Sequence, residues 1–196
     1  MKQVLVINSS LQGENSNSNK AAQRYVDALQ VNETIQLTSV DVHADNIPHL
    51  QGLEMQAWGI AEEQRDEEQK ALAAISDNYV AQVQQADEIV LAIPMYNFGV
   101  PSTLKAYFDR IARAGVTFQY TENGPIGLLE GKKVTVIAAR GGKYEGTAMD
   151  SQTTFVRDFL AFIGLTNVTF YYIEGLAMGE EANNDAWHQF NQKLVN

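Results

Sequence analysis

The amino-acid sequence predicts an α/β fold: a doubly wound five-stranded parallel sheet with helices on both faces. Five short strand-like segments alternate with helical segments along the 196 residues, and this alternation is typical of parallel sheets. Several of the strand-like segments are continuously apolar, a pattern that strands buried on both faces adopt. No linker, repeat or low-complexity segment interrupts the chain, so we expect a single domain over residues 1–196.

The first half of the chain begins with a strand over 2–8, a short apolar run rich in β-branched residues. A polar loop leads into a helix over 18–30, preceded by hydroxyl and amide side chains that are suitable N-caps. Alternating apolar and polar residues predict a second strand over 33–42. Residues 43–61 contain a proline and glycine and are expected to be irregular. A long helix follows over 62–86, acidic at its start.

The second half begins with a buried strand over 89–93 that stops at a proline, and a helix over 102–113 starts directly after another proline. Residues 115–131 are rich in turn-forming residues and form an excursion. A fourth buried strand is expected over 134–139. The same patterns predict the last three elements, a helix over 153–163, a strand over 168–173 and a closing helix over 181–195.

Composition excludes several classes of protein and site. A net charge of −10 argues against a nucleic-acid partner, because phosphate backbones are bound by Lys and Arg. The chain has no cysteine and three isolated histidines, so we expect no disulfide, no thiolate site and no metal. No apolar run approaches the roughly 18–20 residues of a membrane span, and the first strand follows Met1 too closely for a signal segment. We therefore expect a cytoplasmic protein without a membrane segment.

Three unusual loops follow strands at their carboxyl ends, where open α/β sheets bind ligands. The loop over 8–19 carries hydroxyl and small polar side chains just before a helix, and such a helix start binds phosphate. A simply well-capped helix is an equally good interpretation. The loop over 94–101 carries three large side chains that suit a planar aromatic ligand or cap the core. The third, 139–142, ends in paired glycines that permit close backbone approach or form an ordinary turn.

Other nucleotide-binding patterns are absent. No G-x-G-x-x-G follows the first strand, so the sequence does not predict a dinucleotide-fingerprint domain. Gly131-Lys132-Lys133 lacks the upstream glycine and the following hydroxyl residue of a P-loop. The polar residues after the first strand also argue against a receiver-type signalling domain, which would need acidic residues there.

With these loops placed, the sequence resembles the FMN-dependent azoreductases, also called FMN-dependent NADH:quinone oxidoreductases. The motifs that carry the resemblance are Ala92-Ile93-Pro94-Met95-Tyr96-Asn97-Phe98, the stretch from Ala112 to Pro125, and Arg140-Gly141-Gly142. The resemblance extends over essentially the whole chain. It implies a flavodoxin-like fold with strand order 2-1-3-4-5, and a homodimer that holds FMN at the subunit interface.

The resemblance also implies the site residues. Those expected at the FMN phosphate are Ser10, Ser16, Asn17 and Ser18. Those expected along the isoalloxazine are Met95, Tyr96, Asn97 and Phe98. Those expected at its pyrimidine edge are Ala139, Arg140, Gly141 and Gly142, although Ala139 replaces a hydroxyl residue that relatives can have. Tyr120 and Phe162 match aromatic positions that wall the substrate space.

The implied activity is transfer of two electrons from NADH or NADPH, through flavin N5, to quinones and aromatic azo compounds with ping-pong kinetics. No side chain is assigned as a catalytic acid, base or nucleophile, because the flavin carries the chemistry. Alternatives are an NAD(P)H:FMN reductase that releases reduced flavin, a flavodoxin-type electron carrier, and a flavin-free scaffold.

The excursion over 115–131 adds apolar residues to a domain that already has a core. These residues are Val116, Phe118, Tyr120, Ile126, Leu128 and Leu129. An apolar surplus of this kind marks an interaction surface, and the resemblance assigns that surface to the dimer partner. We expect Phe162 to act across this interface.

Overall fold

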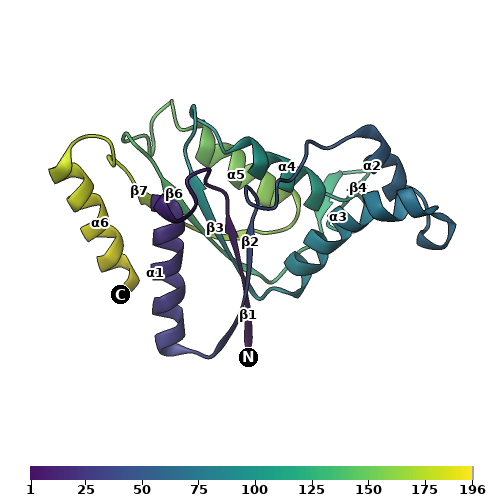
Figure 1. The fold of residues 1–196 in the computed structure, drawn as a ribbon, viewed down its shortest axis with the longest axis horizontal. Helices are drawn as coiled ribbons and strands as arrows, with labels where there is room; N and C mark the ends of the chain where they lie inside the picture. The colour runs from purple at the N-terminus through teal and green to yellow at the C-terminus, as the bar shows by residue number, and fades with distance from the viewer. Residues whose placement is uncertain (196) are drawn as a thin grey trace.

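The computed structural model describes residues 1–195 and has a central sheet between two groups of helices (Figure 1). One face carries α1 (Asn17–Asn32) and α6 (Glu180–Val195). The other carries α3 (Glu67–Gln85), α4 (Ser102–Ile111) and α5 (Ser151–Phe162). Within residues 1–195, no helix has the length and apolar character to cross a membrane.

The sheet is parallel throughout, with the order β2-β1-β3-β6-β7. Its strands are β1 (Lys2–Asn8), β2 (Ile35–Asp41), β3 (Glu88–Pro94), β6 (Lys133–Ala139) and β7 (Asn167–Ile173). Counting only these five strands, the order is 2-1-3-4-5, so the predicted doubly wound fold is confirmed. Their carboxyl ends meet at one edge of the sheet, at the start of α1.

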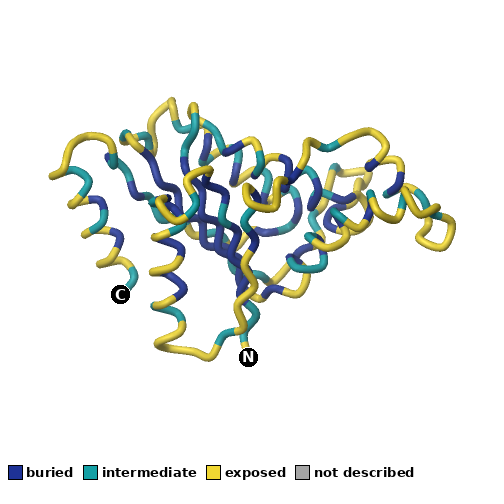
Figure 2. The backbone as a smooth tube through the Cα atoms, in the orientation of Figure 1, coloured by how far each residue is buried: buried dark blue, intermediate teal, exposed yellow. Residues whose placement is uncertain are grey.

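Two hydrophobic cores lie on the two faces of the sheet. Alternate residues of β1 point in opposite directions: Leu5 and Ile7 pack toward α3, α4 and α5, whereas Val4 and Val6 pack toward α1 and α6. All seven residues of β3 are buried, as the apolar run over 89–93 predicts for the middle of the strand. The buried part of the chain accordingly runs through the middle of the sheet in Figure 2.

The prediction that 43–61 is irregular is wrong in part, because this segment contains the helix α2 (Gly52–Trp58). Its inward side chain Glu54 is charged, so the apolar spacing that marks a helix is missing. Glu54 is buried and pairs with the buried Arg110 of α4 at 2.7 Å. Arg110 also donates to the Pro48 carbonyl oxygen at 2.6 Å, which holds the segment against the domain.

The helix predicted over 62–86 begins later than expected. Residues Glu62–Gln64 form a 3₁₀ turn, and α3 starts at Glu67 after a capping box. The Asp66 carboxylate accepts from the Gln69 backbone N–H at 2.8 Å, and the Gln69 side chain accepts from the Asp66 N–H at 3.1 Å. The Asp-x-x-Gln spacing is a sequence signal for this start. The other predicted ends agree with the structure to within two residues.

The excursion over 115–131 is a β-hairpin made of β4 (Phe118–Thr121) and β5 (Gly124–Gly127). Two residues, Glu122 and Asn123, join its strands, and Gly124 at the start of β5 has φ 105°, a conformation that favours glycine. Its second strand packs on the end of α5, where a Cβ added to Gly127 would lie 1.9 Å from the Gly164 nitrogen. The predicted excursion over 115–131 is therefore confirmed, and it has regular structure of its own.

At the amino end of the sheet, the buried carboxylate of Glu88 forms ion pairs with two lysines. Glu88 lies 2.8 Å from the Lys2 ammonium and 3.1 Å from that of Lys133, and it accepts from the Tyr25 hydroxyl at 2.6 Å. Burial alone would raise the pKa of Glu88, but the hydrogen bonds from Lys2, Tyr25 and Lys133 lower it below its ordinary value. This network lies at the opposite end of the sheet from the three loops.

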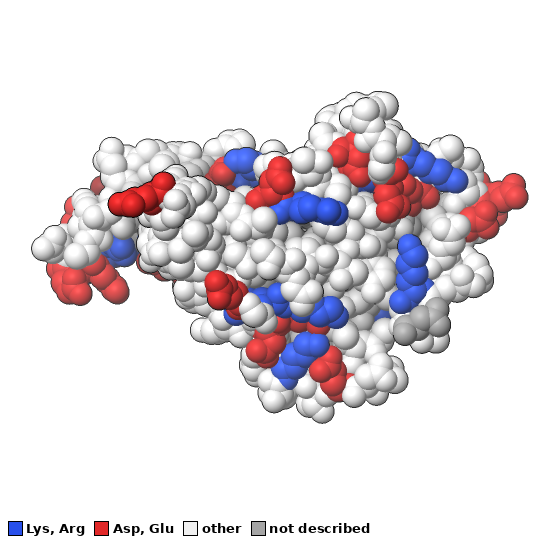
Figure 3. Space-filling view, turned by 180° about the vertical axis from the view of Figure 1, so that it is seen from behind, with Lys and Arg blue, Asp and Glu red and all other residues white. Residues whose placement is uncertain are grey.

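The surface charge is distributed in small clusters. On the face shown in Figure 3, Lys and Arg lie beside Asp and Glu, with uncharged surface between the clusters. Oppositely charged pairs also form within helices, such as Lys70 with Glu67 and Lys105 with Asp109. This face presents no extended basic surface.

Candidate functional site

The three strand-end loops are joined by direct hydrogen bonds. The Ser10 hydroxyl lies 3.1 Å from that of Tyr96, which also accepts from the Leu11 backbone N–H at 3.2 Å. The Met95 N–H donates to the Ala139 carbonyl oxygen at 2.9 Å. Ala139 therefore serves through its backbone in joining the second loop to the third. The sequence prediction that these loops gather at one edge is confirmed.

The first loop ends in buried hydroxyls at the start of α1. Ser16 is the N-cap, accepting from the Asn19 N–H at 3.3 Å, and its hydroxyl lies 2.9 Å from that of Ser18. Both serines are buried. The N–H groups of Asn17 and Ser18 donate to none of residues 1–195, as expected in a first helical turn. Such a group of donors at a positive helix end is suited to a phosphate.

The second loop turns through two residues with left-handed backbone. Asn97 has φ 50° and Phe98 φ 67°, and Tyr96 and Gly99 exchange backbone hydrogen bonds of 3.1 and 3.0 Å around them. Asparagine tolerates this conformation, but phenylalanine rarely adopts it. Backbone strain of this kind gathers at ligand sites. The Phe98 ring is 43% exposed, and neither turn N–H donates to any of residues 1–195.

The start of α5 holds the second loop in place. The Gln152 amide nitrogen donates to the carbonyl oxygens of Pro94 and Gly99, both at 3.0 Å. The Ser151 hydroxyl donates to the Phe98 carbonyl oxygen at 2.6 Å. The carbonyl oxygens of Pro94, Phe98 and Gly99 are thus engaged by the start of α5, whereas the turn N–H groups are left without an acceptor within residues 1–195.

The third loop uses its carbonyl groups in the same way. The carbonyl oxygens of residues 140–142 accept from backbone N–H groups of residues 175–177 at 3.0–3.2 Å. The N–H groups of Gly141 and Gly142 donate to nothing within residues 1–195. Two adjacent donors are therefore left for a ligand or water, as the pyrimidine edge of a flavin would require.

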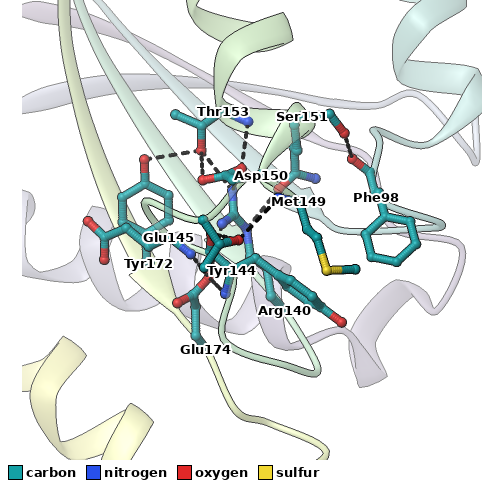
Figure 4. A network of polar contacts seen from close by, with 12 residues as sticks. Phe98, Arg140, Tyr144, Glu145, Met149, Asp150, Ser151, Thr153, Tyr172 and Glu174 are labelled. Atoms are coloured by element: carbon teal, nitrogen blue, oxygen red, sulfur yellow. Dashed lines mark hydrogen bonds and ion pairs between the residues drawn. The ribbon is translucent and has the colours of Figure 1, made fainter.

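The Arg140 side chain turns away from the loop edge. It is 1% exposed and binds Asp150, Thr153 and Glu174 inside the protein (Figure 4). Its Nε also donates to the Gln152 side chain. A buried guanidinium is stable only when it is paired in this way. The Arg140 backbone is also engaged, because its N–H donates to the Ile173 carbonyl oxygen at 2.9 Å and its carbonyl oxygen accepts from the Leu176 N–H at 3.2 Å. The donors that this loop offers to a ligand are therefore those of Gly141 and Gly142.

Tyr120 and Phe162 belong to an aromatic series on the hairpin side of the molecule. Phe118 lies between them, 4.3 Å from the Phe162 ring and 5.4 Å from the Tyr120 ring. Tyr120 is 74% exposed. Within residues 1–195, neither ring stacks on Tyr96 or Phe98. Within one chain, therefore, Tyr120 and Phe162 do not stack on the aromatic rings of the second loop.

The apolar surplus of the excursion is smaller than the sequence suggests. Phe118 and Leu129 are buried in this chain. The residues that stay exposed form what we call the hairpin patch, Val116, Tyr120, Ile126 and Leu128.

Sequence reasoning missed several side chains that build the site. Tyr144 packs on Gly142, where an added Cβ would lie 2.9 Å from the ring, and it meets the Phe98 ring edge-on at 5.7 Å. Gln152 and Glu174 are polar residues whose partners are distant in sequence, and no local pattern marks them. Asp150, which caps α5 by accepting from the Thr153 N–H at 3.0 Å, has a recognisable N-cap position.

The fold and these loops define a flavodoxin-like α/β protein with a site for a phosphorylated planar ligand. Comparison with known proteins agrees. A family model described by its flavodoxin-like fold matches residues 2–196. The FMN-dependent NADH:quinone oxidoreductase of Alteromonas mediterranea is 55% identical over 195 residues, covering 100% of this chain and 98% of the relative. The enzyme of the same name from Pseudoalteromonas atlantica is 48% identical, covering 100% and 96%.

Solved structures give the same result. The crystal structure of an azoreductase from Bacillus anthracis has a TM-score of 0.88 and 25% identity, covering 99% of this chain and 97% of that one. This chain belongs to the family of FMN-dependent NADH:quinone oxidoreductases, within the flavodoxin-like fold.

Proposed function

We propose that this chain is an oxidoreductase that binds FMN and uses NADH to reduce quinones. The observation that carries the proposal is the set of N–H groups left without protein partners at the three loops. Those of Asn17 and Ser18 suit the FMN phosphate, and those of Asn97, Phe98, Gly141 and Gly142 suit the polar edge of its ring. The names of its relatives support the same assignment.

The protein's part in the reaction is to bind and orient. FMN, when bound, would supply the chemistry of accepting a hydride at N5 and delivering two electrons, so that NADH, a proton and a quinone become NAD⁺ and a hydroquinone. The turn at Asn97 and Phe98, held by bonds from Ser151 and Gln152, would supply donors to the ring edge. We assign no acid or base among the side chains, and solvent supplies the protons.

Two finer points extend the proposal. Aromatic azo compounds are expected as further acceptors, with two NADH and two protons consumed for each azo bond cleaved to two amines. Ping-pong kinetics are expected because donor and acceptor are both flat and would compete for one surface near Tyr96, Tyr120 and Phe162. We place the reaction in the cytoplasm, where NADH is supplied.

We further propose a homodimer that completes each site. The hairpin patch is apolar and exposed, and it continues the series Tyr120–Phe118–Phe162. A partner seated on the patch would cover it and bring its own aromatic rings toward the open side of the flavin. Exposed apolar groups of this kind favour association.

A visible spectrum of the purified protein, before and after anaerobic NADH, tests the function. We expect flavin absorbance that stays with the protein through gel filtration and bleaches with NADH. A colourless protein that cannot be reconstituted with FMN would overturn the proposal. Loss of FMN on the column would favour a flavin reductase. Slow direct reduction of the bound flavin by NADH would favour an electron carrier.

A further inference from the structure

Glu174, the first residue after β7, binds residues on both sides of the two donor glycines of the third loop with a single carboxylate oxygen. Its Oε1 accepts from the backbone N–H groups of Tyr144 and Glu145, each at 2.9 Å. The same oxygen accepts from Nη1 of Arg140 at 2.9 Å. The two donor glycines, Gly141 and Gly142, lie between these attachment points.

The remaining groups of Arg140 are also bound (Figure 4). Its Nε donates to Gln152 at 3.1 Å, and its Nη2 donates to Asp150 at 2.9 Å and Thr153 at 2.8 Å. Burial alone would raise the pKa of Asp150, but the hydrogen bonds from Arg140 and Thr153 lower it, so the carboxylate is ionised at neutral pH. The cluster therefore combines one cation with two carboxylates, a net charge of −1.

This cluster links the third loop to the second. From Glu174 the contacts run to Arg140, then to Gln152, whose amide nitrogen donates to the carbonyl oxygens of Pro94 and Gly99 at 3.0 Å. The two loops that carry the ring-edge donors are thus held by one connected set of hydrogen bonds. A buried network in which each member is satisfied gives a rigid arrangement.

We propose that Glu174 is a positioning residue for the bound flavin: it fixes the Gly141 and Gly142 donors and offsets the charge of Arg140 beside the pyrimidine edge. This inference rests on the proposed function. Without the Glu174 charge the cluster would be neutral, because Asp150 still pairs with Arg140. A reduced flavin carries more negative charge than an oxidised one, so this loss of nearby negative charge would favour the reduced form. Glu174 therefore keeps the midpoint potential of the flavin low.

Two variants separate geometry from charge. Glu174→Gln keeps an oxygen that can accept from the loop N–H groups and removes the negative charge. Glu174→Ala removes both. The matched control is Glu181→Gln, because the exposed Glu181 side chain lines the same hollow as Glu174 and makes no hydrogen bond within residues 1–195.

The first measurement is the midpoint potential of the FMN-loaded protein. For Glu174→Gln we expect reduced FMN to bind about tenfold more tightly relative to oxidised FMN, a rise of about 30 mV for a two-electron couple. Glu181→Gln should stay at the wild-type value. A Glu174→Gln potential equal to that of the control would overturn the electrostatic part of the inference.

The second measurement is hydrogen exchange in the chain without FMN. Glu174→Ala should exchange faster than wild type in peptides covering 140–146 and unchanged in peptides covering β1. It should also bind oxidised FMN more weakly in a fluorescence titration, whereas Glu174→Gln binds close to wild type. Wild-type exchange rates and FMN affinity in Glu174→Ala would overturn this inference and leave the proposed function intact. A wild-type chain that binds no FMN would overturn both.

Discussion

The hydroxyl oxygens of Ser10 and Tyr96 lie 3.1 Å apart, although 86 residues separate them in the chain. The same phenol accepts from the Leu11 N–H at 3.2 Å. One ring therefore ties the loop proposed for the phosphate to the loop proposed for the isoalloxazine, and it sets their spacing.

Removing that phenol should weaken FMN binding while leaving the fold intact. Tyr96→Phe deletes hydrogen bonds to the first loop, and a typical net bond is worth about 0.5–1.5 kcal/mol. We expect the Kd for FMN to rise about two- to tenfold in a fluorescence titration. Tyr120→Phe is the control, because that hydroxyl is exposed and makes no hydrogen bond within residues 1–195. Equal affinities of the two variants would contradict this role.

The phosphate assignment can be tested with two ligands that differ only in the phosphate. Ser16→Ala with Ser18→Ala removes two hydroxyls at the start of α1, and bonds to charged groups are worth about 1.5–3 kcal/mol. The double variant should lose FMN affinity but bind riboflavin as wild type does. The ratio of the Kd for riboflavin to the Kd for FMN, measured by titration, should therefore decrease. A ratio equal to that of the wild type would show that the phosphate binds elsewhere.

The contact between the hairpin and α5 predicts a large stability effect. A Cβ at Gly127 would lie 1.9 Å from the Gly164 nitrogen, so Gly127→Ala must push two backbones apart. We expect a loss of about 1–3 kcal/mol or more in the free energy of unfolding, from urea titration. Gly52→Ala is the matched control, because no atom lies within 4 Å of its added Cβ. A Gly127→Ala protein as stable as that control would show that the hairpin seats differently.

The Glu88 network predicts how stability depends on pH. Burial would lower the pKa of Lys2, but hydrogen bonds to Glu33 and Glu88 raise it from 10.5 to about 12. A raised pKa in the folded state means a contribution that is present below pH 10.5 and lost as the pH rises through about 12. The lowered pKa of Glu88 acts in the opposite direction. Its contribution is present above about pH 4.5 and lost as the pH falls below that value.

Lys2→Met should therefore lower the free energy of unfolding at neutral pH, and its difference from wild type should shrink between pH 10.5 and 12. Urea titrations across this range measure that difference. Lys70→Met is the control, because it removes a lysine whose partner, Glu67, is exposed. A difference from wild type that stays constant with pH would contradict the role of Lys2.

The proposed dimer makes a prediction about Phe162. Its ring lies 4.3 Å from Phe118 beside the hairpin patch, and aromatic pairs contribute about 0.5–1.5 kcal/mol beyond their area. Phe162→Ala should raise the acceptor KM or change acceptor preference with FMN still bound. Sedimentation of the wild type should give about twice the 21.7 kDa chain mass. A fully active monomer would refute the shared site.

Local patterns predicted the elements whose own residues determine them. The strand β3 is buried along its whole length, so its apolar run was sufficient. The helix α2 was missed because its inward residue, Glu54, is stabilised by Arg110, which lies 56 residues further along the chain. The direction of the Arg140 side chain likewise depends on Asp150 and Glu174. Pairings of this kind form only when the sheet brings separate segments together.

The order of the sheet has a consequence for synthesis of the chain. β1 is made before the other four strands of the sheet, yet it lies inside the sheet, between β2 and β3. Its second edge has no partner until residues 88–94 have been made, and β3 in turn waits for 133–139. Pairings this distant form slowly, and an unpaired apolar strand promotes aggregation. The growing sheet therefore presents an unpaired apolar edge until residue 139 of the 196 has been made, and this is the interval in which a chaperone would protect it.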